Sequence, residues 1–313
     1  MDLYYEINGK GEPIVLLHSG GVDLRDWTFV TPLLSSDYQV ISFDARGVGK
    51  SISPSKQVNY VDDLKSVLDY FEFKRATLVG HSIGGQIATD FTLEYPERVA
   101  KLVLIAPALS GFDYSKDFKD YIQSINEAAP DVDKMMELSL RSPSYRVIKA
   151  SPRQDLWMEM HRDYFERMLG WPAFEMLWPQ QPAIQRLEEL TVKTLLLIGD
   201  EELPDNQRVA ECFRQVPAVR VVEIAGADHM VTLTHPEKLT RIITDLWRMT
   251  ATMPRTPEEN ERIRKRSQAN ILDAAMELFI KKKGIMLLRL AMWRYRPTFQ
   301  KDYFITTIKE KSS

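Results

Sequence analysis

The chain has 313 residues, 44% hydrophobic and 27% charged, and a formal net charge of −3 at pH 7, which is typical of a soluble globular protein. Its single cysteine, Cys212, excludes an internal disulfide, and no apolar run approaches the roughly 20 residues that span a bilayer. The N-terminus lacks the basic and apolar regions of a signal peptide, so we expect a cytoplasmic protein with no membrane segment.

From the N-terminus, short apolar or alternating runs that predict strands take turns with stretches of helical spacing. The predicted strands are 3–8, 13–17, 40–43, the run from Thr77, 101–105, 192–198 and 219–224; the predicted helices are 59–71, 86–95, 207–215 and 235–248. This alternation predicts an α/β fold, with a mostly parallel sheet and helices on both faces.

The motif Gly80-His81-Ser82-Ile83-Gly84 follows the apolar run from Thr77 and precedes the helix predicted over 86–95. A sharp turn from strand to helix needs small residues where the backbone crowds, and Gly80 and Gly84 meet that need. Such a turn would lift the Ser82 hydroxyl above the sheet edge, at the positive end of the helix. Ser82 is therefore the candidate nucleophile.

Between Ala106 and Leu190 the alternation stops, and aromatic residues, methionines and helix formers accumulate. We interpret about 110–187 as a helical cap over the strand ends. Most of its aromatic side chains should pack the cap on the body, while a few should line an apolar pocket. The expected pocket residues are Ser19, Trp157, His161, Trp171 and Trp178, with a plain surface position as the alternative for His161.

Residues 1–249 resemble the α/β-hydrolase family, because nucleophile, acid and histidine follow in that family's order. Gly199-Asp200-Glu201-Glu202 resembles the turn that carries the acid, and Gly226-Ala227-Asp228-His229 the loop that carries the base. The resemblance implies a triad of Ser82, His229 and Glu202, with Asp205 as the alternative acid. It also implies an oxyanion hole made by the backbone N–H groups of Ile83 and Gly20, although family members usually have glycine where Ser19 stands.

The remaining histidines suggest other roles: His81 should point away from the site, and His18 should order its loop by hydrogen bonds. No cluster of His, Cys and Asp has metal-binding spacing, so we predict neither a metal nor an organic cofactor.

Residues 250–313 form a tail of different composition. Lys and Arg outnumber Asp and Glu by 14 to 7 in residues 251–313, against 27 to 37 in the remainder. Residues 253–284 resemble the start of a tetracycline-repressor-family DNA-binding domain, through an amphipathic helix at 262–283 that contains Ala274-Ala275-Met276-Glu277-Leu278-Phe279.

After Gly284 no helix-turn-helix pattern remains in the tail. If the third base of each codon is joined to the first two bases of the next codon, the shifted reading frame can encode a helix-turn-helix. We therefore interpret the residues after Gly284 as the product of a frameshift. Without a recognition helix we expect a disordered or loosely docked extension, and no specific nucleic-acid partner.

The sequence as a whole predicts a serine hydrolase that cleaves a small ester, thioester or lactone through an acyl-enzyme. One alternative is a cofactor-free carbon–carbon bond hydrolase or perhydrolase on the same triad. Another is a non-catalytic small-molecule-binding module linked to a transcription regulator. The expected partner is a small acyl substrate, and the sequence does not indicate an oligomeric state.

Overall fold

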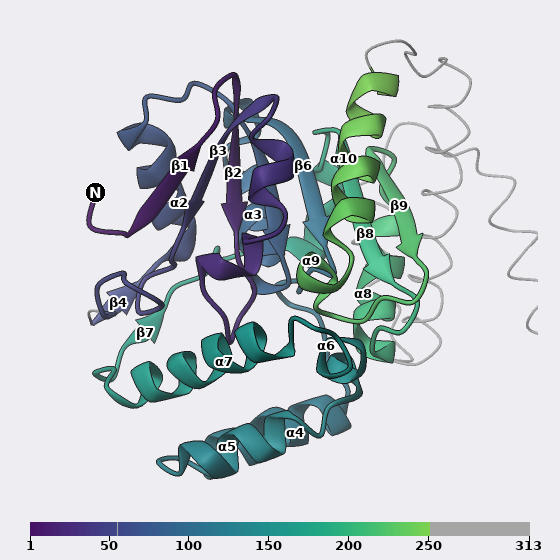
Figure 1. Ribbon diagram of the computed structural model, residues 1–313. Helices are drawn as coiled ribbons and strands as arrows, with labels where there is room; N and C mark the ends of the chain where they lie inside the picture. The colour runs from purple at the N-terminus through teal and green to yellow at the C-terminus, as the bar shows by residue number, and fades with distance from the viewer. Residues whose placement is uncertain (55, 251–313) are drawn as a thin grey trace, which may run out of the picture. The chain divides into compact units, whose positions relative to one another are not determined.

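Seven strands form the central sheet of the protein in the order β1-β3-β2-β5-β6-β8-β9. The computed structural model describes residues 1–54 and 56–250 (Figure 1). The sheet strands are β1 (Tyr5–Asn8), β2 (Glu12–Leu17), β3 (Tyr38–Phe43), β5 (Ala76–His81), β6 (Val99–Ile105), β8 (Thr194–Gly199) and β9 (Val219–Ile224). β1 runs antiparallel to β3 and the other neighbours are parallel, which confirms the predicted mostly parallel sheet.

Both faces of the sheet are covered because its strands are apolar on both sides. In β2, Val15 and Leu17 pack in one core cluster while Ile14 and Leu16 pack in another. The first cluster includes residues of α2 (Tyr60–Tyr70), α3 (Ile83–Glu94) and α8 (Pro204–Arg214). The second includes residues of α1 (Thr31–Leu34), α9 (Val231–Thr234) and α10 (Pro236–Thr250), together with the 3-10 helix η1 (Leu24–Trp27).

The segment between β6 and β8 is mainly helical and lies beyond the carboxyl ends of the parallel strands (Figure 1). Its helices are α4 (Lys116–Glu127), α5 (Val132–Ser139), α6 (Arg146–Lys149) and α7 (Gln154–Leu169), with short 3-10 turns η3 (Pro143–Tyr145), η4 (Ala183–Gln185) and η5 (Leu187–Glu189). A two-stranded parallel sheet of β4 (Gln57–Val58) and β7 (Glu175–Met176), which the sequence did not predict, joins this cap to the body. Another 3-10 turn, η2 (Pro96–Arg98), precedes β6.

Several predicted boundaries move by one to three residues, and two of them are explained by their surroundings. The helix after Ser82 begins at Ile83 rather than Gln86, because Ser82 itself occupies the N-cap position. The first strand begins at Tyr5 rather than Leu3, whose side chain is buried in the core. None of the helices in the described residues is long and apolar enough to cross a membrane. The predictions for residues 251–313 lie outside the described residues.

Candidate active site

Ser82 sits on a sharp turn between β5 and α3, with backbone angles φ 53° and ψ −115°. A non-glycine residue with positive φ is uncommon and marks a strained turn. The flanking glycines make this turn possible: a Cβ on Gly80 would lie 2.4 Å from the carbonyl oxygen of Gly84, and one on Gly84 would lie 2.4 Å from that of Leu17. The close backbone approach that the motif predicts is therefore present around Ser82.

His229 and Glu202 form a hydrogen-bonded pair beside the same cavity that Ser82 lines. Nδ1 of His229 lies 2.7 Å from Oε2 of Glu202. Burial would raise the pKa of Glu202, but the His229 charge and hydrogen bonds outweigh it and lower this pKa. Burial would likewise lower the pKa of His229, but the Glu202 charge and hydrogen bond outweigh it and raise this pKa above its ordinary value near 6.5. The carboxylate thus favours the protonated imidazolium.

Asp205, the alternative acid, makes different contacts. Its carboxylate accepts hydrogen bonds from the backbone N–H of Ser115 at 3.0 Å and from the Ser115 hydroxyl at 2.6 Å. It also pairs with Arg208 at 2.5 Å. These contacts attach the start of α4 to α8. Of the two carboxylates, the structure brings Glu202 to His229.

Asn206, which the sequence analysis missed, supports the pair. Its side chain donates a hydrogen bond to Glu202, which lowers the pKa of that carboxyl, and its amide nitrogen lies 3.3 Å from Nδ1 of His229. Asn206 follows Asp205 in the first turn of α8. Its role depends on how this helix packs against the His229 loop, so no local sequence motif marks it.

The Ser19-Gly20 turn is ordered by buried groups on both sides. The backbone N–H of Ser19 donates to Asp26 at 3.1 Å. Nδ1 of His18 lies 2.7 Å from the carbonyl oxygen of Ser19, while Nε2 of His18 accepts the N–H of Ala45 at 3.0 Å. His18 therefore donates from Nδ1 and orders its loop, as the sequence predicts. Because the Ser19 carbonyl and the Gly20 N–H belong to one peptide unit, this hydrogen bond polarises the Gly20 donor.

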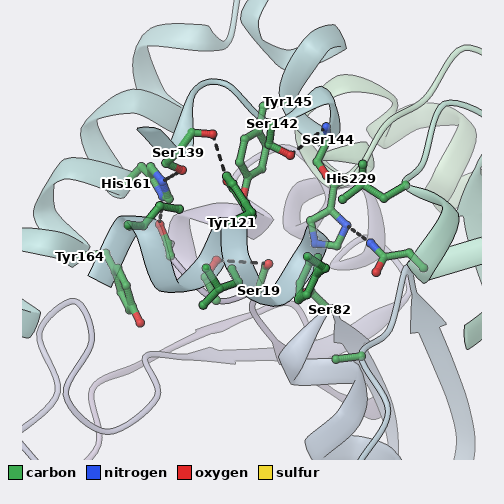
Figure 2. Close-up of a pocket in the computed structure, with 18 of the residues that line it drawn as sticks. Ser19, Ser82, Tyr121, Ser139, Ser142, Ser144, Tyr145, His161, Tyr164 and His229 are labelled. Atoms are coloured by element: carbon green, nitrogen blue, oxygen red, sulfur yellow. Dashed lines mark hydrogen bonds between the residues drawn. The ribbon is translucent and has the colours of Figure 1, made fainter. Parts of the chain in front are cut away.

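A cavity of about 250 Å³ lies between the strand ends and the cap. Ser19, Ser82, His161 and His229 line it (Figure 2), and so does Gly20, so the structure brings these predicted residues together. The cap contributes polar groups that the sequence analysis missed, namely Tyr121, Asn126, Ser139, Ser142, Ser144, Tyr145 and Tyr164. These hydroxyls and this amide are spread over residues 121–164, and the folded cap collects them at the cavity.

His161 is a buried cavity residue rather than a surface residue. Its Nδ1 lies 2.8 Å from the carbonyl oxygen of Gly21, and its Nε2 lies 2.6 Å from the Ser139 hydroxyl. Burial lowers the pKa of His161, which favours the neutral ring that donates to Gly21 and accepts from Ser139. This side chain of α7 thereby ties the cap to the loop that follows Gly20.

The prediction that three tryptophans line the pocket is wrong. The residues that line this cavity do not include Trp157, Trp171 or Trp178. Trp157 is buried in a separate apolar cluster with Val22 and Met230. Trp171 donates from Nε1 to the carbonyl oxygen of Gly47 at 3.0 Å. Trp178 packs against the main core. In all three cases the indole fastens the cap to the body instead of facing the cavity.

The loop that carries His229 is bonded to the cap on its other side. Asp228 is fully buried and accepts hydrogen bonds from the backbone N–H groups of Val147 and Ile148 in α6, at 2.5 and 3.3 Å. The backbone N–H of His229 donates to the carbonyl oxygen of Ser144 at 3.2 Å. The imidazole of His229 is thus held in position by its acid partner, Glu202, and by the cap.

Among the described residues, no group of three or more His, Cys, Asp and Glu side chains could hold a metal ion.

Comparisons with known proteins show the family and the fold. A family model described as alpha/beta hydrolase fold matches residues 12–236. The 2-hydroxy-6-oxo-6-phenylhexa-2,4-dienoate hydrolase of Comamonas testosteroni is 34% identical over 113 residues, which are 34% of this chain and 40% of that protein. The match thus spans less than half of this curated relative.

Solved structures share the fold. Carboxylesterase CesB from Bacillus subtilis superposes with a TM-score of 0.65 at 21% identity, covering 77% of this chain and 86% of that one. A meta-cleavage product hydrolase from Pseudomonas fluorescens IP01 gives 0.62 at 22% identity, covering 79% and 94%.

Proposed function

Because the chain belongs to the α/β-hydrolase family, we propose that it is a serine hydrolase that cleaves a small ester, thioester or lactone through an acyl-enzyme. The observation that carries the proposal is the pair of His229 and Glu202, 2.7 Å apart, beside the cavity that also holds the strained Ser82 turn. A pure binding module has no need of a nucleophile, a base and a buried carboxylate in one place.

In the proposed reaction, the Ser82 hydroxyl attacks the substrate carbonyl while Nε2 of His229 takes its proton. Glu202 holds the proton on Nδ1 and stabilises the imidazolium without itself becoming protonated. The imidazolium then gives its proton to the departing alcohol, thiol or ring oxygen, leaving an ester on Ser82. Water, deprotonated by His229, attacks that ester, and Ser82 regains its proton as the acid departs.

The oxyanion formed in both steps is proposed to accept hydrogen bonds from the backbone N–H groups of Ile83 and Gly20. Ile83 is the first residue of α3, where N–H groups have no partner within the helix and the helix dipole favours negative charge. Gly20 lies in the loop ordered by His18 and Asp26. Losing one such donor typically costs about 3–4 kcal/mol of transition-state stabilisation.

The cavity favours an uncharged substrate. Its lining supplies hydroxyls, imidazoles, amides and apolar groups, and the described residues that line it include no lysine or arginine. A buried carboxylate on the substrate would lack a cationic partner, which is costly in a partly desolvated site. The Comamonas relative is named for a dienoate, which carries a carboxylate. Neutral ester hydrolysis therefore fits this cavity better than carbon–carbon cleavage of such an acid.

A matched pair of esters tests the proposal. Wild-type protein should hydrolyse methyl butanoate with a kcat/KM at least tenfold above that for monomethyl succinate, which replaces the terminal methyl group by a carboxylate. The Ser82→Ala variant should hydrolyse neither ester. A preference for the charged ester would contradict the neutral-substrate proposal, and activity that survives in Ser82→Ala would contradict the serine mechanism.

For the tail, we propose that residues 253–284 are the start of a tetracycline-repressor-family domain that continues out of frame after Gly284. The support is the helical pattern and the Ala274–Phe279 stretch. Resequencing the DNA tests it: a shifted frame that encodes a helix-turn-helix supports the proposal, and a shifted frame without one rejects it.

A further inference from the structure

The cavity is continuous with an apolar groove on the outer edge of α4. Tyr114, Phe118, Ile122 and Asn126 line the cavity, and the same residues line a wider open groove together with Lys119, Gln123 and Glu127. Phe118, Ile122 and Asn126 recur every fourth residue, so they form one edge of the helix. From residue 118 to 126 this edge extends about 12 Å along the helix axis.

The apolar side chains of this edge are partly open to solvent, since Phe118 is half-buried and Ile122 is exposed. Ile125, one position away, is buried with Phe165, whereas Ile122 is 40% exposed. Tyr114 and Phe118 stack with ring centroids 4.8 Å apart, so the groove has an aromatic pair at the end nearest the start of α4. Exposed apolar surface that adjoins a binding cavity is typical of a ligand groove. The three polar residues at its rim can lay their aliphatic stems along a bound chain and keep their polar ends in water.

We propose that this groove binds the unbranched aliphatic chain of the ester substrate, with the scissile carbonyl at Ser82 and the chain leaving the cavity along Tyr114, Phe118 and Ile122. This inference rests on the proposed ester hydrolysis and deepens it by naming the substrate class as neutral aliphatic esters of medium chain length. A cavity of about 250 Å³ is small beside typical ligand pockets of 300–1,000 Å³, so a longer chain must extend beyond it. Each methylene placed on the groove should strengthen binding about twofold to fourfold.

Binding and hydrolysis of two ester series test the groove. The first series compares methyl butanoate with methyl octanoate and varies the acyl chain. The second compares butyl acetate with octyl acetate and varies the alkoxyl chain. In the Ser82→Ala background, the longer member of at least one series should bind more tightly by roughly tenfold to a hundredfold, measured by calorimetric titration. In wild-type protein the same series should show a matching rise in kcat/KM.

Ile122→Glu places a charge where the cavity opens into the groove and should weaken the longer ester several-fold more than the short one, and Ile122→Ala should show a smaller difference of the same sign. Leu33→Glu is the matched control, because Leu33 is also 40% exposed but lies on α1, outside both cavity and groove. The proposal would be overturned if affinity did not change with chain length in either series. It would also be overturned if Ile122→Glu weakened the binding of short and long esters equally. A chain-length gain in binding without hydrolysis of any ester would support the groove and reject the serine hydrolase.

Discussion

The Asp26 carboxylate lies 2.7 Å from Nδ1 of His81, and both side chains are completely buried. Nε2 of His81 lies 2.8 Å from the backbone carbonyl oxygen of His229. Both ring nitrogens of His81 therefore face oxygen atoms, one of the Asp26 carboxylate and one of the His229 backbone. Burial would raise the pKa of Asp26, but the charge and hydrogen bond of His81 outweigh it and keep this pKa below its ordinary value.

This pair joins the parts of the site. Asp26 also accepts hydrogen bonds from the backbone N–H of Ser19 at 3.1 Å and from the hydroxyl of Thr232 at 2.5 Å. His81 directly precedes Ser82. His81 does not line the cavity, but it does not point away from the site either: its ring centroid lies 5.2 Å from that of His229, and its contact with the His229 carbonyl gives it a positioning role.

Replacing Asp26 by Asn should lower the free energy of unfolding by about 1–3 kcal/mol or more, because an amide cannot make all the contacts of this buried carboxylate with Ser19, His81 and Thr232. Urea unfolding measures the change. Asp69→Asn is the control, since Asp69 pairs with Lys65 and Arg98 at the surface and should cost at most about 1 kcal/mol. Equal effects of the two variants would contradict the account of Asp26 as a buried carboxylate that joins three parts of the site.

Glu202→Gln should reduce kcat by about 10²–10⁴-fold, since an amide neither fixes the His229 tautomer nor stabilises the imidazolium. Asp205→Asn should reduce it less than about fivefold, because Asp205 bonds Ser115 and Arg208 instead. Steady-state hydrolysis of methyl butanoate compares the two variants. The reverse order of losses would identify Asp205 as the acid.

The pH dependence of kcat/KM should report His229, which must be neutral to accept the Ser82 proton. Because Glu202 raises the pKa of His229, activity should rise with pH through a midpoint above the ordinary 6.5 and then level off. In Glu202→Gln the residual activity should have a lower midpoint, because the negative charge is gone. A midpoint unmoved by this substitution would show that another group controls the profile.

Gly84→Ala should destabilise the protein by about 1–3 kcal/mol or more, because its Cβ would lie 2.4 Å from the backbone oxygen of Leu17 and the strand would have to shift. Thermal unfolding followed by circular dichroism measures this. At Gly170 the nearest atom would be 3.5 Å away, so Gly170→Ala should change little. A Gly84→Ala variant as stable as Gly170→Ala would contradict the close packing of the turn.

The sequence predicted the sheet well because buried parallel strands require short apolar runs, as in Pro13–Leu17 and Lys101–Ile105. The Ser82 turn was also visible, since Gly80 and Gly84 are needed locally. Asp26 and Asn206 were missed because they reach the site only through tertiary packing. The prediction for the cap tryptophans failed because an indole such as that of Trp171 is equally suited to a cavity wall and to a packed interface. The amino-acid composition of the cap does not distinguish the two, and only the fold does.

Labelling with a fluorophosphonate probe tests the central claim most directly, because the probe phosphonylates only an activated serine. Wild-type protein should be labelled at Ser82, located by mass spectrometry of the peptide, and a chain ending at Thr250 should be labelled as well. Ser82→Ala should remain folded by circular dichroism and show no labelling. A folded wild-type protein that takes up no probe, or carries it on another serine, would contradict the assignment of Ser82 as the nucleophile.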